Sequence, residues 1–290
     1  MHGRSALWLL APAVVALLTI VGYPLVETVR LSFTSTELIG GGGGFVGLDN
    51  FATALGSADF WSSMRITVTF TVLTVAIEMV FGLLVALLLN LKLRGRGFVR
   101  GLLIIPWALP TVINAMMWRV IYNPEFGALN AGLQQMGIIG DYRSWLGDPD
   151  VALYAVAVAD IWKTVPLVAL ILLAALQGVS QELRDAASID GAGPLARFWT
   201  VTWPAILVPV SIVVVLRIIE AVKVFDVIWV MTHGGPLNAT RSLAILVYQQ
   251  AFSFHHSGYG AALSLLSVVL SLVLIALYVV SLRRQQSATA

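Results

Sequence analysis

The sequence predicts an all-α polytopic membrane protein with six transmembrane helices. Three observations point to this class. Of the 290 residues, 59% are hydrophobic and only 11% are charged, whereas an ordinary soluble domain carries about 25% charged residues. The mean hydropathy is +0.90. Apolar runs of about 20 residues or more, long enough to cross a hydrocarbon core of ~30 Å, alternate with polar intervals along the whole chain.

The first apolar run, Leu7 to Val26, follows Arg4 and allows two interpretations. A secretory signal peptide would place its cleavage site at residues 11–13 (Ala-Pro-Ala). That site falls inside the apolar run, so cleavage would leave half of the segment behind. We therefore expect an uncleaved transmembrane helix, followed by a polar loop over residues 31–65 with a short helix at 48–55.

The second and third runs each carry a feature that is unusual in lipid. The second run, Ile66 to Leu89, contains Glu78. A charge is costly in hydrocarbon, so we expect this carboxylate to be buried and paired inside the protein. The third run, Leu102 to Ile121, contains Pro106 and Pro110 and should bend there, because proline lacks the N–H that a helix needs. The polar interval over 123–150 is expected to pack as a small cap.

The last three runs are Val151 to Leu176, Ile206 to Met231 and Ala261 to Leu282. The fifth run carries four charges of alternating sign at intervals of three, namely Arg217, Glu220, Lys223 and Asp226. Residues three apart are neighbours on a helix surface, so adjacent members of this ladder can pair.

Four charges in one transmembrane run require a protein-lined or wet surrounding, because each costs at least about 2.5–3.5 kcal/mol at the bilayer centre. Two interpretations remain open: the ladder lines a solute pathway, or it clamps the fifth helix to a neighbour. Trp162 in the fourth run would likewise stack on a solute or simply pack. The candidates for the pathway are Asn114, Trp118, Trp162, Lys163, Glu220, Lys223 and Asp226.

The distribution of Lys and Arg predicts the orientation. With the N-terminus inside, nine basic residues lie in cytoplasmic segments and five in outer segments, which satisfies the positive-inside rule. The cytoplasmic set is Arg4, Lys92, Arg94, Arg96, Arg100, Arg184, Arg197, Arg283 and Arg284, and the outer set is Arg30, Arg65, Arg119, Arg143 and Arg241. We expect a multi-pass protein of the cell membrane with both termini in the cytoplasm.

The polar stretch from Gln181 to Pro204 reads QELRDAASIDGAGPLARFWTVTWP. Its first part favours a short helix with a face of small residues. Gly191 and then Gly193-Pro194 impose a turn, because glycine accepts a positive φ and proline cannot continue a helix. A second helical piece over 195–202 leads to Pro204, an early position of the next helix. A plain loop with chance Gly and Pro is the alternative to a helix–turn–helix that docks in a groove of another protein.

The spacing in this stretch resembles the EAA loop of ABC-importer permeases, which reads EAA, three residues, Gly, nine residues, Ile, one residue, Leu-Pro. The corresponding residues here are Asp185-Ala186-Ala187, Gly191, Val201 and Trp203-Pro204. Asp replaces Glu, which shortens by one methylene the side chain that the family directs at a basic partner. The stretches 100–130, 160–177 and 222–252 also look like the carbohydrate-uptake permeases, in particular the first permease subunit of maltose- and glycerol-phosphate-type systems.

The resemblance implies the transmembrane-domain architecture of type I ABC importers. It implies one permease domain over 1–290, core helices over about 66–282 and a cytoplasmic coupling loop over 181–204. The implied ATPase-coupling residues are Asp185, Ala186, Ala187, Asp190, Gly191 and Pro204. The implied partners are a homologous second permease subunit, two ABC ATPases, an extracytoplasmic solute-binding protein, membrane lipid and a sugar or sugar derivative. ATP and magnesium would be bound by the ATPases, and this chain would hold no cofactor.

No catalytic motif is present in the sequence. It contains no Walker lysine motif, H-E-x-x-H, G-x-S-x-G or dinucleotide fingerprint, and it has no cysteine. We expect no enzyme activity, no metal site and no nucleic-acid binding, and we interpret His255-His256 as part of a polar turn. The alternative function is a proton-coupled secondary transporter in which intramembrane carboxylates carry protons, although no inverted repeat is recognisable.

Overall fold

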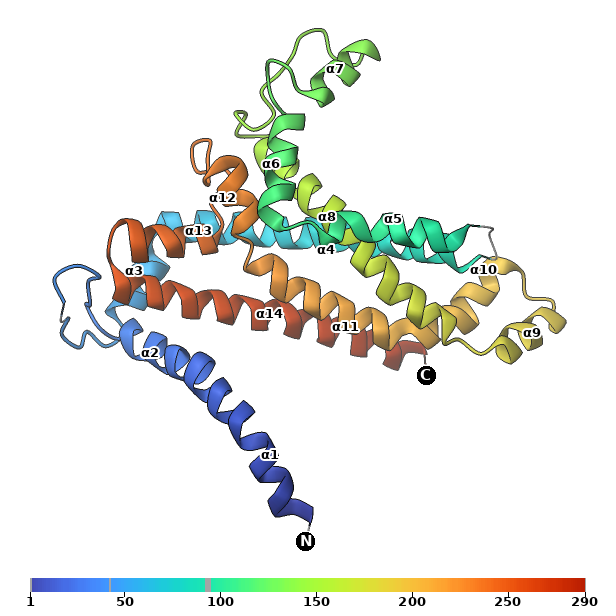
Figure 1. Cartoon of the computed structure of the whole chain (residues 1–290), viewed down its shortest axis with the longest axis horizontal. Helices are drawn as coiled ribbons and strands as arrows, with labels where there is room; N and C mark the ends of the chain where they lie inside the picture. The colour runs from blue at the N-terminus through green and yellow to red at the C-terminus, as the bar shows by residue number, and fades with distance from the viewer. Residues whose placement is uncertain (1, 42, 92–94, 290) are drawn as a thin grey trace. The chain divides into compact units, whose positions relative to one another are not determined.

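The computed structural model describes the backbone of residues 2–41, 43–91 and 95–289, and the side chains from Leu10 to Leu282 within those ranges. The described residues are mainly helical, and their β structure is limited to one bridge between Thr34 and Phe45. They form two compact units, Met1–Met64 with Leu243–Leu272 and Arg65–Ser242 with Val273–Ala290. The long helices α4 (Ala58–Asn90) and α14 (Ser257–Thr289), which are labelled in Figure 1, each contribute residues to both units.

Five helical segments of the described chain are long and apolar enough to cross a membrane, at residues 10–32, 58–90, 152–177, 194–222 and 257–282. A sixth span results when α5 (Arg96–Ala108) and α6 (Thr111–Ile121) are counted together, although they meet at a bend of 92°. The predicted all-α polytopic class is confirmed. The first span runs to Ser32 and is therefore longer than the apolar run suggested.

The bend between α5 and α6 has a local cause. Leu109 is extended, with φ −65° and ψ 134°, because the ring of the following Pro110 disfavours helical geometry at the preceding residue. Pro110 itself precedes the first residue of α6. Pro106 lies inside α5, so the predicted break falls at Pro110 and not at Pro106.

The first unit contains the span built from α1 (His2–Leu17), η1 (Leu18–Gly22) and α2 (Tyr23–Ser32), followed by α3 (Asp49–Gly56). It also contains α13 (Leu243–Tyr248), η3 (Gln249–Ser253) and the first part of α14. Two backbone hydrogen bonds join the loop after α2 to the start of α14, from Leu38 N to His255 O at 2.7 Å and from Gly258 N to Thr36 O at 2.9 Å. The short helix expected at 48–55 is confirmed as α3.

Two prolines in the transmembrane segments are each preceded by a widened helical turn, and the helix continues past them. The π-helical turn η1 ends two residues before Pro24, and η2 (Phe198–Thr202) ends two residues before Pro204. A proline ring clashes with the carbonyl four residues earlier, and a widened turn relieves that clash. The second helical piece of the 181–204 stretch is therefore continuous with the fifth span, from Pro194 to Val222.

The second unit contains α7 (Ala128–Gln135), α8 (Ala152–Gln177), α9 (Gln181–Ile189), α10 (Pro194–Arg197), α11 (Trp203–Val222) and α12 (Asp226–Thr232). The prediction of one helix over 206–231 is wrong, because α11 ends at Val222 and α12 starts at Asp226. Ser242 Oγ donates a hydrogen bond of 2.9 Å to Val224 O inside the break. The Ser242 hydroxyl thus provides the hydrogen bond that the Val224 carbonyl would have received from a backbone N–H in a continuous helix.

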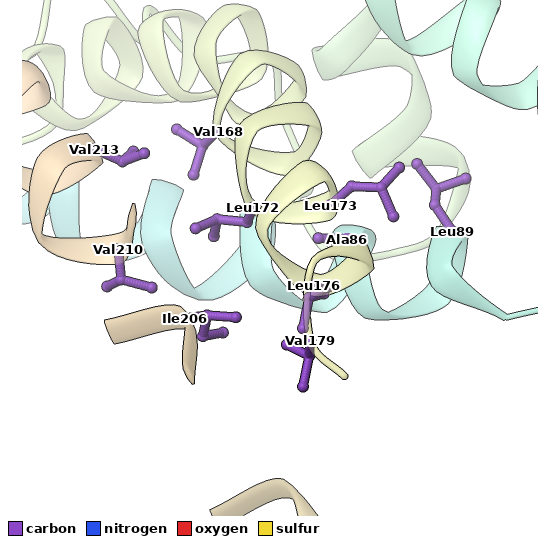
Figure 2. Packing of buried hydrophobic residues seen from close by; sticks show 10 residues of the cluster. All are labelled: Ala86, Leu89, Val168, Leu172, Leu173, Leu176, Val179, Ile206, Val210 and Val213. Carbon is purple, nitrogen blue, oxygen red and sulfur yellow. The ribbon is translucent and has the colours of Figure 1, made fainter. Parts of the chain in front are cut away.

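The apolar core of the second unit is built around α8. Figure 2 shows Leu173 of α8 beside Leu89 of α4, while Leu172 points towards Val210 of α11. Ile206 and Leu176 are fully buried near the end of α8. Lipid is as apolar as these side chains, so close packing rather than the hydrophobic effect holds such helices together.

The cap expected over 123–150 is present and is organised by Asn130, which is fully buried. Its Nδ2 donates to the carbonyls of Asn123 at 3.2 Å and Arg143 at 3.0 Å. Its Oδ1 accepts from Trp145 Nε1 at 2.8 Å. One amide side chain therefore joins three parts of the loop.

Candidate functional site

A polar cavity of about 390 Å³ lies in the second unit, among the transmembrane helices. Its walls come from α5, α6, α8, α11, α12 and the break at 223–225. The lining residues are Trp107, Thr111, Asp160, Lys163, Thr164, Leu167, Arg217, Glu220, Ala221, Lys223, Val224, Phe225, Asp226 and Val227. The structure thus brings together four of the predicted pathway residues, Lys163, Glu220, Lys223 and Asp226.

The break after α11 decides which charges reach this cavity. Arg217 and Glu220 are three positions apart on α11 and share one side of that helix. The chain leaves the helix at Lys223 and restarts at Asp226, and both of these residues line the cavity although a straight helix would rotate them away. Lys223 and Asp226 are exposed.

A buried charge cluster forms one wall of the cavity. Arg217 donates two hydrogen bonds to Glu78, from Nε to Oε2 at 2.7 Å and from Nη2 to Oε1 at 3.0 Å. The same guanidinium reaches Asp160 Oδ2 at 3.3 Å and contacts Glu220. Glu78 is 0% exposed, so the expectation of a buried, paired carboxylate is confirmed. Because these residues lie on α4, α8 and α11, one arginine ties three helices together.

The predicted ladder of neighbouring pairs along the fifth run holds only at its first step, Arg217 with Glu220. In the described part of the chain, Lys223 and Asp226 have no ion-pair partner. The reason is that α11 has ended before Lys223, so the three-residue spacing no longer places these charges side by side. The clamp to neighbouring helices is instead made by Arg217 across to Glu78 and Asp160.

Lys163 connects α8 to the bend between α5 and α6. Its Nζ donates a hydrogen bond of 3.0 Å to Oγ1 of Thr111, the first residue of α6. Trp107 of α5 lines the same cavity as this pair. The bent span thus has a polar attachment to α8 at the point where it changes direction.

Three of the predicted pathway residues lie outside the cavity lining. Asn114 is fully buried and donates from Nδ2 to Ala159 O at 3.1 Å, which joins α6 to α8. The Trp118 ring centroid lies 5.2 Å from that of Tyr122 and 6.1 Å from that of Trp162. The contact between Trp118 and Trp162 thus also joins α6 to α8, whereas Trp118 and Tyr122 lie one turn apart at the end of α6.

Several cavity residues were not predicted from the sequence. Trp107, Thr111 and Phe225 have no charge to mark them in an apolar run. The pairing of Glu78 with Arg217 spans 139 positions, which no local spacing reveals. The sequence did show that Glu78 and Arg217 are both charges in apolar runs, and that each therefore requires a partner of opposite charge.

The turn in the 181–204 stretch has the geometry of a Schellman motif at the end of α9. Gly191 has φ +80°, and its N–H bonds to Ser188 O at 3.1 Å. Ala192 N bonds to Ala187 O at 2.9 Å. This closing pattern needs a left-handed residue at the glycine position. The predicted helix and turn are confirmed, and Asp190 is the residue that caps α9.

We call residues 181–204, which comprise α9, the turn, α10, η2 and the start of α11, the elbow. Asp185 and Ala186 are exposed on α9 and Ala187 is half-buried, while Asp185 accepts a hydrogen bond of 2.8 Å from Gln181 Nε2. The elbow also exposes four large apolar side chains, Leu183, Ile189, Leu195 and Trp199, of which Ile189 is 86% exposed. Exposed apolar side chains on a polar segment are a feature of protein contact surfaces.

The charge asymmetry that predicts the orientation includes residues beyond the described part. Lys92 and Arg94 lie outside the described residues, and so do the side chains of Arg4, Arg283 and Arg284. The orientation therefore stays a prediction from the sequence.

Comparisons with known proteins identify the family. The sequence profile described as "Binding-protein-dependent transport system inner membrane component" matches residues 78–287. The chain is 44% identical over 229 residues to the trehalose/maltose transport system permease protein MalF of Thermococcus litoralis, covering 79% of this chain and 76% of that protein. It is 33% identical over 270 residues to the sn-glycerol-3-phosphate transport system permease protein UgpA of Agrobacterium fabrum, covering 92% of this chain and 91% of that protein.

The fold is also that of a solved transporter. A chain of the bacterial alginate ABC transporter, crystallised with an alginate pentasaccharide-bound periplasmic protein, superposes with a TM-score of 0.81 at 21% identity, covering 94% of this chain and 93% of that one. The matching proteins are transport subunits and not enzymes. This chain therefore belongs to the binding-protein-dependent transport system inner membrane components, as a permease subunit of a carbohydrate ABC importer.

Proposed function

We propose that this chain forms half of the translocation path of an ATP-driven, binding-protein-dependent sugar importer, and that its elbow docks an ABC ATPase. One observation carries the proposal. Four of the six charged residues of the polar cavity lie on α8 and α11, and these are the same two helices that enter and leave the elbow. A movement imposed on the elbow therefore acts directly on the cavity walls.

The surface of the elbow suits a protein partner. Leu183, Ile189, Leu195 and Trp199 offer apolar contact area beside the exposed carboxylate of Asp185. Small side chains at Ala186 and Ala187 allow close approach of another backbone. The Schellman turn at Gly191 fixes the angle between the two arms, so the surface is presented in one arrangement.

The cavity suits a hydroxyl-rich solute. Lys163 and Lys223 supply hydrogen-bond donors and Glu220 and Asp226 supply acceptors, while Trp107 and Phe225 supply flat apolar surface. A sugar ring presents hydroxyl groups that donate and accept, together with an apolar face of C–H groups. A second, homologous permease subunit would complete the path.

The remaining partners follow from the family. Two ATPases would bind ATP and magnesium, and an extracytoplasmic solute-binding protein would deliver the sugar. The positive-inside rule predicts both termini in the cytoplasm, and this orientation would put the elbow on the side of the ATPases. ATP would drive transport by favouring one of two arrangements of the helices, since a ligand shifts an equilibrium only by its differential affinity for the two states.

The test is uptake by the complete complex, both permeases with their ATPases, in liposomes with the binding protein outside. We expect uptake to require ATP inside and to survive an uncoupler. A photo-crosslinking residue at Ile189 should capture the ATPase, and one at Val158 on α8 should not. Uptake without nucleotide that collapses with the uncoupler would instead establish the proton-coupled alternative.

A further inference from the structure

The side chain of Arg184 attaches α9, the first helix of the elbow, to the end of α8. Arg184 on α9 donates a hydrogen bond of 2.8 Å from Nη2 to the carbonyl oxygen of Leu176, in the last turn of α8. The last carbonyls of a helix have no partner within it and carry the negative end of its dipole. A guanidinium placed there makes a charge-assisted bond, which is stronger than a neutral one.

The same residue starts a chain of bonds that crosses the elbow. Ser188 Oγ donates to the backbone carbonyl of Arg184 at 3.0 Å and accepts from Arg197 Nη1 at 2.6 Å. Arg197 is the last residue of α10, which is continuous with α11. The hydrogen bonds therefore run from the end of α8, through α9, to the helix that becomes the fifth span.

The attachment point on α8 is itself rigid. Leu176 is fully buried and belongs to the core cluster that also contains Val179 of the connection and Ile206 of α11 (Figure 2). Arg184 is half-buried, whereas the apolar residues beside it on α9, Leu183 and Ile189, are strongly exposed. Arg184 thus faces its own chain and not the surface offered to a partner.

We propose that Arg184 is a positioning residue that makes α9 and α8 one rigid body, with Ser188 and Arg197 closing the other side of the elbow. This inference rests on the proposed docking of an ATPase at the elbow. A displacement of α9 by the ATPase then moves α8 with it, together with the cavity residues Asp160 and Lys163 on α8. Without the hydrogen bond from Arg184 to Leu176 O, α9 would move with the ATPase while α8 keeps its position. Each ATP hydrolysed would then drive less transport.

The experiment measures rigidity and coupling in the complete reconstituted complex. The chain contains no cysteine, so Val158→Cys on α8 and Glu182→Cys on α9 give two unique spin-label sites at exposed positions. We expect the distance between the labels to be the same with and without ATP, and to change with ATP once Arg184→Met is added. Sugar imported per ATP hydrolysed should fall about tenfold or more in that variant, the effect of losing one hydrogen bond to a charged group.

Three further variants serve as controls. Arg184→Lys keeps a cation at the helix end and should restore part of the coupling. Ser188→Ala removes the link to Arg197 without touching a charge and should loosen the elbow even if Arg184→Met fails to insert. Gln177→Met alters an exposed residue in the same turn of α8 and should leave transport unchanged.

The inference is overturned if the distance between the labels already changes with ATP in the parent chain. It is also overturned if Arg184→Met and Ser188→Ala import as much sugar per ATP as the parent. Loss of the ATPase from pulled-down Arg184→Met complexes would make Arg184 a docking contact and would also overturn it. Failure of the proposed function is recognised separately. In that case the parent complex itself yields no crosslink between Ile189 and an ATPase.

Discussion

Arg217 of α11 and Glu78 of α4 meet through two hydrogen bonds of 2.7 and 3.0 Å, although they lie 139 positions apart in the sequence. The pair is flanked by Asp160 and Glu220, so one guanidinium serves three carboxylates. The pair is almost fully buried, with side-chain exposures of 7% and 0%. The cavity wall therefore depends on this arginine more than on any single carboxylate.

Arg217→Met should destabilise the chain strongly. Removing one partner of a buried ion pair costs about 3–5 kcal/mol, because a charge is left without compensation. Thermal unfolding of the purified complex in detergent measures the effect. Glu220→Gln should be close to neutral, since the Glu220 side chain is 58% exposed. The double variant Glu78→Leu with Arg217→Met should regain part of the lost stability, and a cost equal to the sum of the two single variants would contradict the pairing.

Lys223→Ala should change transport and leave stability nearly unchanged. Lys223 lines the cavity, is exposed, and has no ion-pair partner among the described residues. Uptake assays with several sugars, together with a melting temperature, separate the two roles. A lowered melting temperature with unaltered uptake would show that Lys223 is a structural cation. Asn114→Ala should instead lower the melting temperature and leave the choice of sugar unchanged, because the Asn114 amide joins α6 to α8 through Ala159 O.

Gly191→Ala should uncouple the elbow without crowding it. A Cβ at this position meets nothing within 4 Å, so the penalty comes from the backbone, whose φ of +80° costs a non-glycine residue about 1–2 kcal/mol. ATP-driven uptake in membrane vesicles should fall while membrane insertion persists. Gly193→Ala is the matched control, because Gly193 has an ordinary φ of −66° and equally open surroundings. Equal uptake by both variants would show that the turn at Gly191 is not required.

Gly82→Ala should weaken the contact between α4 and α8. A Cβ at Gly82 would lie 2.5 Å from Val168 Cγ1 and 2.9 Å from Val168 Cβ, so the helices would have to move apart. Overpacking of this kind typically costs about 1–3 kcal/mol. A melting curve tests it, and Val168→Ala in the same chain should relieve part of the cost, because alanine lacks Cγ1 but keeps Cβ. The helical Gly101 has open space around it, and Gly101→Ala should be tolerated.

The sequence by itself determined the features that depend on hydropathy and on local backbone chemistry. Long apolar runs fix the spans because only a helix satisfies its own backbone in lipid. Pro110 fixes the bend between α5 and α6, and Gly191 fixes the turn of the elbow, because these residues restrict or permit φ at one position. The spacing of the elbow also identified the family.

The tertiary structure decided which charges meet and which face the cavity. The fifth run looks like one helix in sequence because its residues are uniformly apolar between the charges. It breaks after Val222, where Ser242 satisfies Val224 O from 18 positions away. That break carries Lys223 and Asp226 to the cavity and leaves Arg217 to pair with Glu78 and Asp160. Such pairings are contacts between distant segments, and their free energy depends on burial that no local pattern encodes.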